Sequence, residues 1–511
     1  MHTNTVSSVL SLTVVLLASG AVQAATPRGP DFDSDGYDDA AIGVPSEDVG
    51  SAYDAGAVNL LYGSPTGPTT KPGYIDTLWE DLAGVEGASK DMGNYGHSLA
   101  WGDLDGDCYD DLVIGVRGAG PGALSVFYGG SAGLSVDHEE RIELGTFVWD
   151  VAAGDYNGDG LADVAVGTLE AVGDGEGAVH VFYGGPDGLA AANPPRGALL
   201  HRATGTIPGE PTHDGFATAL VSGDLDCDGR DDLAIAAPRA ELMQQYANAG
   251  SVVVVYGSDA GLTGAASVEL TQGGAAHGVP AYNALFGGDL AAGNFNGDTA
   301  MVDGVAIECV DLAVTVNGGV QVFFGTHDAG IQATAPDDRL FAAGDLVLAD
   351  ERVAQLSIGR VNSDSFDDLV LGTMLEDLVD EYDSIGAIVL LPGSTSGPLA
   401  AKRVRWTQDT LNVTDTAEIG DHFGAATVFG WYRGLAAPGG LIVGAPYEDV
   451  GGVPNVGLVN SIALANTATP ATASGGKHWW HGNIGSQQSE ANDNFGGVMA
   501  TTRKAVRCWI D

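Results

Sequence analysis

Short apolar runs separated by glycine-rich turns recur along the whole chain. One set of runs follows directly after acidic segments and reads AAIGVP, LVIGV, VAVGT and LAIAAP. A second set ends in a glycine turn and reads LLYGSPTG, VFYGGSAG, VFYGGPDG, VVYGSDAG, VFFGTHDAG and LLPGSTSG. Apolar runs of this length, bounded by Gly, Pro, Ser and Asp, are typical of β-strands joined by tight turns. The pattern therefore predicts an all-β chain.

The strands are organised as a long repeat. The acidic segments start at Asp31, Asp103, Asp155 and Asp224, with weaker counterparts at Asn294 and Arg360, so the interval is 52 to 72 residues. A seventh unit keeps only the run LIVGAP at 441–446. Short strands with glycine turns at this period predict the blades of a β-propeller.

The ends of the repeat predict how the ring closes. The first unit begins at its acidic segment, and the segment NDNFGGVMATT from Asn492 is a strand without a unit of its own. If this C-terminal strand completes the first blade, two open sheet edges disappear. We therefore expect a seven-bladed β-propeller whose C-terminal strand closes the first blade.

Four acidic segments share one nonapeptide pattern: DFDSDGYDD, DLDGDCYDD, DYNGDGLAD and DLDCDGRDD. Oxygens at positions 1, 3 and 5, the main-chain carbonyl at position 7 and a carboxylate at position 9 can wrap around a hard cation. Because every ligand is oxygen, the pattern favours Ca²⁺ over zinc or copper, and over Mg²⁺, which retains several waters. It predicts about four calcium sites, with the ligands Asp31, Asp33, Asp35, Tyr37, Asp39, Asp103, Asp105, Asp107, Tyr109, Asp111, Asp155, Asn157, Asp159, Leu161, Asp163, Asp224, Asp226, Asp228, Arg230 and Asp232.

The alternative interpretation of these segments is a set of solvated turns, which Asp, Asn and Gly also favour. Four near-complete ligand sets at the same point of a repeat argue against it. The fifth segment is interrupted between Asp298 and Asp311, and the sixth has Arg360 at position 1, so neither is counted as a site. Since one loop supplies all ligands and its carboxylates repel one another without metal, we expect a structural ion.

The order of the motifs resembles the FG-GAP repeats of the integrin α-subunit propeller. The FG elements are Tyr95-Gly96, Phe286-Gly287, Phe423-Gly424 and Phe495-Gly496, with Phe216-Ala217 as a weaker copy. The resemblance covers nearly all of the mature chain. It implies that the calcium loops brace one face of the propeller and that partners bind the opposite face. In this chain the filled loops are the first four, which departs from the family's order.

Charge and targeting signals bound the class of protein. With 20 Lys and Arg against 68 Asp and Glu, the formal net charge is −48, which disfavours nucleic acid and anionic membranes as partners. Residues 1–24 read as a secretory signal peptide, with an apolar stretch, a small-residue cleavage site and no Lys or Arg before it. Residues 25–511 then form the propeller. We expect a secreted or cell-surface protein with no membrane span, and peripheral attachment to the surface stays open.

An exported chain permits disulfides among its four cysteines. Cys227 lies in the fourth acidic loop and Cys309 in the insertion of the fifth, so both face one rim on adjacent blades. Cys508 follows the closing strand and would lie beside Cys108. We predict the pairs Cys227–Cys309 and Cys108–Cys508, with free thiols as the alternative.

Two motifs invite a catalytic interpretation. The G-x-S-x-G match around Ser131 falls on the glycine turn that every unit repeats, whereas a hydrolase nucleophile elbow joins a strand to a helix. In the cluster Lys477-His478-Trp479-Trp480-His481, we expect Trp480 to pack on an outer strand, like Trp79 and Trp406. Trp479, His478 and His481 are left as candidate ligand contacts.

No catalytic constellation emerges from the sequence, so we predict that the chain is not an enzyme and has no cofactor besides calcium. The favoured function is an adhesion or binding module for an extracellular protein or glycan. Two alternatives remain: an extracellular hydrolase or lyase of unrecognised type, and a purely structural component of the cell surface. We expect specificity in the insertions 173–177, 241–249 and 375–384, which differ between units.

Overall fold

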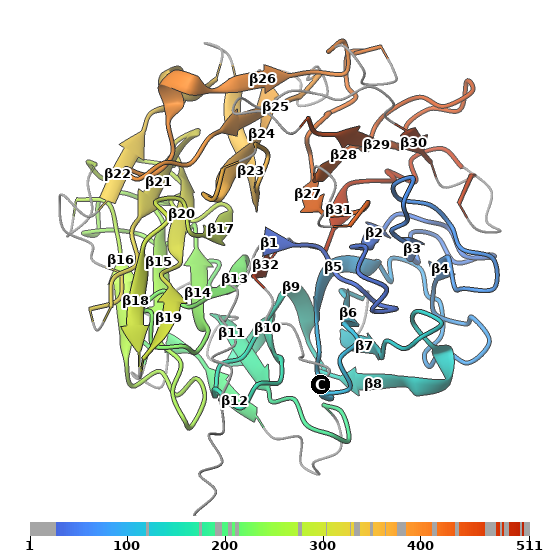
Figure 1. Ribbon diagram of the computed structural model, residues 1–511, viewed down its shortest axis with the longest axis horizontal. Coiled ribbons are helices and arrows are strands. Elements are labelled where there is room, and N and C mark those ends of the chain that lie inside the picture. The colour runs from blue at the N-terminus through green and yellow to red at the C-terminus, as the bar shows by residue number, and fades with distance from the viewer. Residues whose placement is uncertain are drawn as a thin grey trace, which may run out of the picture.

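The chain forms a ring of seven four-stranded antiparallel sheets (Figure 1). The structure is a computed structural model and describes residues 27–118, 122–172, 176–189, 197–202, 207–209, 214–273, 278–302, 304–327, 329–331, 338–347, 351–362, 364–375, 385–410, 416–434, 439–465, 477–480, 483–484, 490–500 and 503–504. The predicted signal peptide lies outside these residues. The predicted seven-bladed propeller is confirmed.

Each blade takes its strands in chain order from the inside of the ring to the outside. Blade 2 contains β5 (Tyr95–Gly102), β6 (Asp111–Val116), β7 (Ala123–Phe127) and β8 (Glu139–Glu143). Blade 3 contains β9 (Phe147–Gly154), β10 (Asp163–Val172), β11 (Glu176–Phe182) and β12 (Gly197–Leu200). Blade 4 contains β13 (Leu220–Gly223), β14 (Asp232–Ala237), β15 (Ser251–Val255) and β16 (Ser267–Leu270).

The remaining blades follow the same plan, with two variations. Blade 5 contains β17 (Leu290–Gly293), β20 (Asp311–Val316), β21 (Gly319–Phe323) and β22 (Asp338–Phe341), and the hairpin β18 (Thr299–Val302) and β19 (Val305–Glu308) is inserted between its first two strands. Blade 6 contains β23 (Glu351–Gly359), β24 (Asp368–Leu375), β25 (Ala387–Leu391) and β26 (Val404–Trp406). Blade 7 contains β27 (Thr427–Gly430), β28 (Gly440–Ala445), β29 (Leu458–Ala463) and β30 (Lys477–Trp479).

Blade 1 is assembled from both ends of the chain, as predicted. Its inner strand is β31 (Val498–Met499), which pairs with β2 (Ala40–Val44), followed by β3 (Ala57–Leu61) and β4 (Thr77–Leu78). A second closure was not predicted: β1 (Pro27–Arg28) pairs with β32 (Arg503–Lys504) in the middle of the ring (Figure 1). This ribbon contacts the inner strands β13, β17, β23 and β27. Two separate pairings therefore join the ends of the ring.

The apolar cores lie between the facing sheets of neighbouring blades. At the junction of blades 7 and 1, Ile42, Val428 and Ile442 are at most 1% exposed and pack in one cluster. Equivalent clusters fill the other junctions, and nearly every residue of the second and third strands is buried. These strands are covered on both faces, which explains why they read as continuous apolar runs instead of alternating ones.

The FG and GAP-like elements interlock at the same junctions. The backbone of Tyr95, in the FG element of blade 2, bridges to Gly56 of blade 1, and its ring is fully buried. Gly96 has a φ of 82°, which favours glycine, and a Cβ on Gly43 would lie 2.2 Å from the Gly96 carbonyl oxygen. Both glycines are needed because the backbones of blades 1 and 2 are in contact here, which leaves no room for a side chain.

Helical structure is confined to short connections among the described residues. These are α1 (Ala343–Leu346) and the 3₁₀ turns η1 (Val136–His138) and η3 (Ala400–Lys402). Within the described part of the chain, no helix has the length and apolar character needed to span a membrane.

Candidate metal centre

The acidic loops all lie on one rim, where each precedes the second strand of its blade. In blades 2 to 6 the loop follows the first strand, and in blade 1 it follows β1. The carboxylate at position 1 organises the turn by accepting main-chain N–H groups from positions 5 and 6. In the first loop Asp31 accepts from Asp35 and Gly36, both at 3.1 Å. In the fourth loop Asp224 accepts from Asp228 at 3.0 Å and from Gly229 at 2.9 Å. The same Asx turn therefore shapes both loops before any ion is considered.

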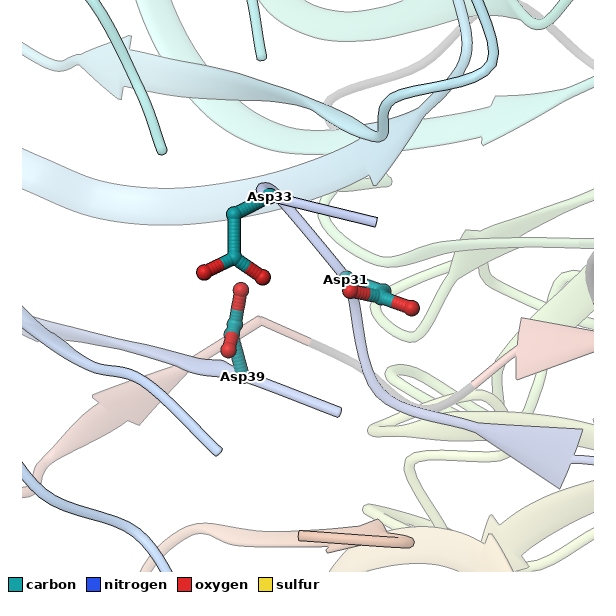
Figure 2. A group of neighbouring side chains, drawn as sticks. All are labelled: Asp31, Asp33 and Asp39. Carbon is teal, nitrogen blue, oxygen red and sulfur yellow. The ribbon is translucent and has the colours of Figure 1, made fainter. Parts of the chain in front are cut away.

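Three loops gather carboxylates from positions 1, 3 and 9. The clusters are Asp31, Asp33 and Asp39; Asp103, Asp105 and Asp111; and Asp224, Asp226 and Asp232. In each cluster, one carboxylate oxygen from each residue lies within 4.8 Å of the corresponding oxygens of the other two. Figure 2 shows the first cluster, in which the carboxylates of Asp33 and Asp39 face one another with Asp31 beside them. Buried carboxylates at this separation repel one another, so the arrangement suits a divalent cation.

The fourth loop gives the sharpest test of fit. Asp226 Oδ1 is buried and has no hydrogen-bond partner among the described residues, although Asp224 and Asp232 lie beside it. Burial, aided by neighbouring carboxylates, raises the pKa of Asp224 to about 8 and that of Asp226 to about 6. A buried carboxylate oxygen without a donor is the group that a hard cation would satisfy. The residues present therefore fit a metal ion.

The third loop is different. Position 3 is Asn157, whose side-chain amide donates to Asp159 Oδ2 at 3.1 Å. No cluster of three carboxylates forms around Asp155, Asp159 and Asp163 in the part of the chain that the structure describes. Position 5 also lies outside the three clusters: Asp35, Asp107, Asp159 and Asp228 each accept the N–H of the position 7 residue, at 2.9 to 3.0 Å. Their role as ligands stays a prediction, as does that of the position 7 carbonyls.

Lys71 occupies the first loop in a way that the nonapeptide did not reveal. Its Nζ contacts Asp33 Oδ2 and lies 2.7 Å from Asp35 Oδ2. Two predicted ligands of this loop are therefore partly neutralised by an internal ammonium group. Lys71 comes from the connection that follows the glycine turn of blade 1, 38 residues after Asp33, so the loop's own sequence holds no signal for it.

The carboxylate at position 9 has a structural role in six blades. It accepts the N–H of position 2 in its own loop and the N–H of the glycine after the third strand, at 2.7 to 3.1 Å throughout. The residues are Asp39, Asp111, Asp163, Asp232, Asp311 and Asp368, all with 0% exposure. Because Asp311 and Asp368 belong to the two degraded loops, this bond does not depend on a complete ligand set.

The aspartate at position 8 joins neighbouring blades, a role that sequence reasoning missed. Asp110 Oδ2 accepts the N–H of Asp31 at 2.8 Å, and Asp231 Oδ2 accepts that of Asp155 at 3.0 Å. At the closure of the ring, Asp38 Oδ2 accepts the N–H of Trp431 at 2.9 Å. The signal in the sequence is the doubled Asp that ends three of the four nonapeptides. The first Asp of the pair accepts a hydrogen bond from the previous blade, and the second accepts hydrogen bonds within its own blade.

The fifth and sixth loops replace ligands with other groups. In the fifth, Asn294 Nδ2 donates to the carbonyl of Asp298 at 2.8 Å. In the sixth, Arg360 Nε donates to Asp367 Oδ1 at 3.1 Å. The predicted Cys227–Cys309 disulfide links the fourth loop to the end of the β18–β19 insertion. Cys508 lies outside the described residues, so the Cys108–Cys508 pairing stays a prediction.

The other candidate groups are placed as follows. Ser131 is exposed in a glycine turn, as predicted, and the short 3₁₀ turn η1 follows it instead of an α-helix. In the C-terminal cluster the expected roles are exchanged: Trp479 is the buried ring at 8% exposure, and Trp480 is partly exposed and stacks on His478 at 5.7 Å. The reason is strand parity, since Trp479 on β30 faces the neighbouring blade. His481 lies outside the described residues.

Comparison with known proteins supports the repeat assignment. The FG-GAP-like repeat family matches residues 103–166, and the FG-GAP repeat family matches residues 216–255. Integrin alpha pat-2 of Caenorhabditis briggsae is 33% identical over 157 residues, which are 27% of this chain and 12% of that protein. The phosphatidylinositol-glycan-specific phospholipase D of Rattus norvegicus is 33% identical over 166 residues, 28% of this chain and 18% of that protein. The match thus spans less than a fifth of either relative.

Among solved structures, a protein from Lactobacillus plantarum has a TM-score of 0.43 at 12% identity, covering 90% of this chain and 98% of that one. The Dos1 propeller has a TM-score of 0.37 at 12% identity, covering 75% and 73%. The similarity to a protein named phospholipase D contradicts our prediction that the chain is not an enzyme. That prediction rested on the missing catalytic constellation, and a missing motif does not exclude activity. The chain is a seven-bladed β-propeller that contains FG-GAP-type repeats at residues 103–166 and 216–255 and resembles the propeller of integrin α-subunits.

Proposed function

We propose that this chain is an exported, calcium-stabilised propeller that binds an extracellular protein or glycan on the rim opposite its acidic loops. The observation that carries the metal assignment is the buried Asp226 Oδ1, which has no hydrogen-bond donor among the described residues and lies in a cluster of three carboxylates. Asp224, Asp226 and Asp232 would hold the ion there. Ca²⁺ would supply the positive charge that keeps these carboxylates ionised at neutral pH.

Exposed apolar side chains support the placement of the binding rim. Met243, Tyr282 and Leu285 are 68%, 67% and 41% exposed, and all lie in connections on the rim opposite the acidic loops. Main-chain bonds of 3.0 Å, from Asn283 to Ala247 and from Leu285 to Asn248, hold these connections of blades 4 and 5 together. Met243 belongs to the insertion 241–249, where we expected specificity. We call Met243, Tyr282 and Leu285 the blade 4–5 patch.

A second group on the same rim lies between blades 1 and 2. Tyr53 is 61% exposed and Met92 is 56% exposed, and the N–H of Met92 donates to the carbonyl of Tyr53 at 2.7 Å. Exposed aromatic and methionine side chains on a chain of net charge −48 are unfavourable in water and favour contact with a partner. The disulfide and the predicted signal peptide at residues 1–24 support a secreted or cell-surface location.

The calcium part of the proposal is tested by thermal unfolding of the mature, oxidised protein in calcium and in chelator. We expect a higher melting temperature in calcium, and a smaller gain for Asp226→Asn. Asp187→Asn is the matched control, because Asp187 is exposed in a glycine turn on the same rim. This substitution changes the net charge by the same amount as Asp226→Asn. Equal melting temperatures with and without calcium would refute a structural ion.

The binding part is tested on arrays of glycans and extracellular proteins. We expect selective binding that Tyr282→Ser weakens. Leu340→Ser is the control, because Leu340 is 40% exposed on an outer strand and away from this rim. Binding that is equally weak in both variants, or absent from the array, would count against the proposed rim.

A hydrolase is the second candidate, favoured by the similarity to phosphatidylinositol-glycan-specific phospholipase D. It is tested by incubating the oxidised protein with a glycosylphosphatidylinositol-anchored substrate and measuring release of the anchored protein. Release above that of a heat-denatured sample would support hydrolysis, and release at the level of the denatured sample would contradict it.

A further inference from the structure

The seventh blade carries the acidic loop's frame with its charge reversed. The N–H of Trp431 donates to Asp38 Oδ2 at 2.9 Å, just as the N–H of Asp31 donates to Asp110 Oδ2 at 2.8 Å. Trp431 therefore occupies position 1 of a seventh loop. Position 3, which is an aspartate in three of the loops, is then Arg433. A group that would repel a cation stands where the other blades gather carboxylates.

Arg433 lines a small cavity at the junction of blades 7 and 1. The cavity has a volume of about 50 Å³ and is lined by Thr66, Gly67, Pro68, Tyr432, Arg433, Gly439, Gly440, Ser461, Ala463 and Lys477. A single water needs about 10–15 Å³ by the same measure, so the space suits a few waters or one small polyatomic ion. Two of the lining side chains are cationic, three carry hydroxyl groups and none is acidic.

Both cations retain free donors. Lys477 Nζ makes one long hydrogen bond of 3.4 Å to the Pro68 carbonyl, which draws the side chain from β30 across to the glycine turn of blade 1. Among the described residues, the Arg433 guanidinium has neither an ion pair nor a hydrogen bond. Five other arginines among the described residues pair with carboxylates: Arg141, Arg202, Arg230, Arg360 and Arg405. Arg433 and Lys477 line one cavity that has no acidic side chain, so the cavity favours an anion.

We propose that this cavity binds a sulfate or phosphate group, held by Arg433 and Lys477. The guanidinium offers a planar fork of N–H donors to tetrahedral oxyanions, and the ammonium adds a point charge. The hydroxyl groups of Thr66 and Ser461 supply neutral donors from the two blades. The net charge of −48 repels small anions in general, so binding requires a local site of this kind. The group is either the free ion or a substituent on a glycan.

The test is a calorimetric titration of the oxidised protein with sodium sulfate. A titration with sodium chloride at matched ionic strength serves as the reference. Sulfate is used because phosphate precipitates with calcium. Arg433→Gln and Lys477→Gln each remove one cation from the cavity. Lys402→Gln is the control, because Lys402 is an exposed lysine of the short turn η3 in blade 6. A parallel titration with N-acetylglucosamine 6-sulfate separates a glycan substituent from the free ion.

We expect saturable binding at a 1:1 ratio, at least tenfold weaker in Arg433→Gln and in Lys477→Gln and unchanged in Lys402→Gln. Tighter binding of the sulfated sugar than of sulfate would assign the site to a glycan, and equal binding would assign it to the ion. No binding of either ligand, or equal binding in all variants, would overturn the proposal. Circular dichroism of each variant checks the fold, and because no metal ligand is changed, the calcium response should remain.

Discussion

The position 9 carboxylate can be separated experimentally from the metal. In blade 6, Asp368 Oδ2 accepts the N–H of Val361 at 2.7 Å and Oδ1 accepts that of Gly393 at 2.8 Å, while Arg360 holds position 1. Asp368→Ala leaves both buried N–H groups without an acceptor. Each unsatisfied group costs about 1–3 kcal/mol, so we expect a loss of about 2–6 kcal/mol in the free energy of unfolding.

The assay is chemical unfolding of Asp368→Ala and of Asp226→Asn, each in calcium and in chelator. The loss for Asp368→Ala should be the same in both conditions. In chelator, Asp226→Asn should be at least as stable as the parent protein, because Asp226 Oδ1 accepts no hydrogen bond among the described residues and the substitution removes one of three repelling carboxylates. It should lose stability in calcium. If the cost of Asp368→Ala disappears in chelator, the structural role we assign to position 9 is wrong.

Three further predictions concern the same rim. Lys71→Gln should strengthen metal binding at the first loop by removing the ammonium beside Asp33 and Asp35, as measured by calorimetry; unchanged affinity would show that Lys71 does not compete with the ion. In chelator, the free energy of unfolding should fall as pH rises from 5 to 8. Burial raises the pKa of Asp163 and of Asp368 to about 8, so the folded state holds protons that the unfolded state has already lost. Each such group lowers the free energy of unfolding by about 1.4 kcal/mol per pH unit. Chemical unfolding at several pH values measures this slope, and a free energy that rises with pH would contradict the prediction. Replacing Cys227 and Cys309 together by Ser should cost about 2–4 kcal/mol in the same assay, and an unchanged midpoint would show that the bridge adds nothing.

The sequence predicted the parts of this structure that repeat. Acidic loop, apolar run and glycine turn recur at one period, and so they indicated the blades, the rim that carries the loops and the Cys227–Cys309 pair. The sequence did not predict side chains that contact another blade or a distant part of their own blade. Lys71 reaches the first loop from a connection whose sequence differs between the units, and the ribbon of β1 and β32 pairs two strands too short to carry a pattern.

The doubled aspartate is a second case in which the sequence did not reveal a contact between blades. Both residues looked like parts of one loop, because a linear motif does not state which blade a side chain touches. Only the geometry shows that Asp110 serves the previous blade while Asp111 serves its own. A repeat sequence therefore reveals its units more readily than the bonds between them.

The seam between blades 7 and 1 is fastened at three depths: β1 with β32 at the axis, β31 with β2 in the sheet, and Trp431 with Asp38 at the rim. An open array of repeats can fray from its terminal units, because each contacts only its neighbours. A ring that is closed in this way has no terminal blade from which unfolding can begin. Partial opening must break all three contacts before the first blade is released, which favours slow, all-or-none unfolding and makes resistance to proteases depend on the rate of unfolding.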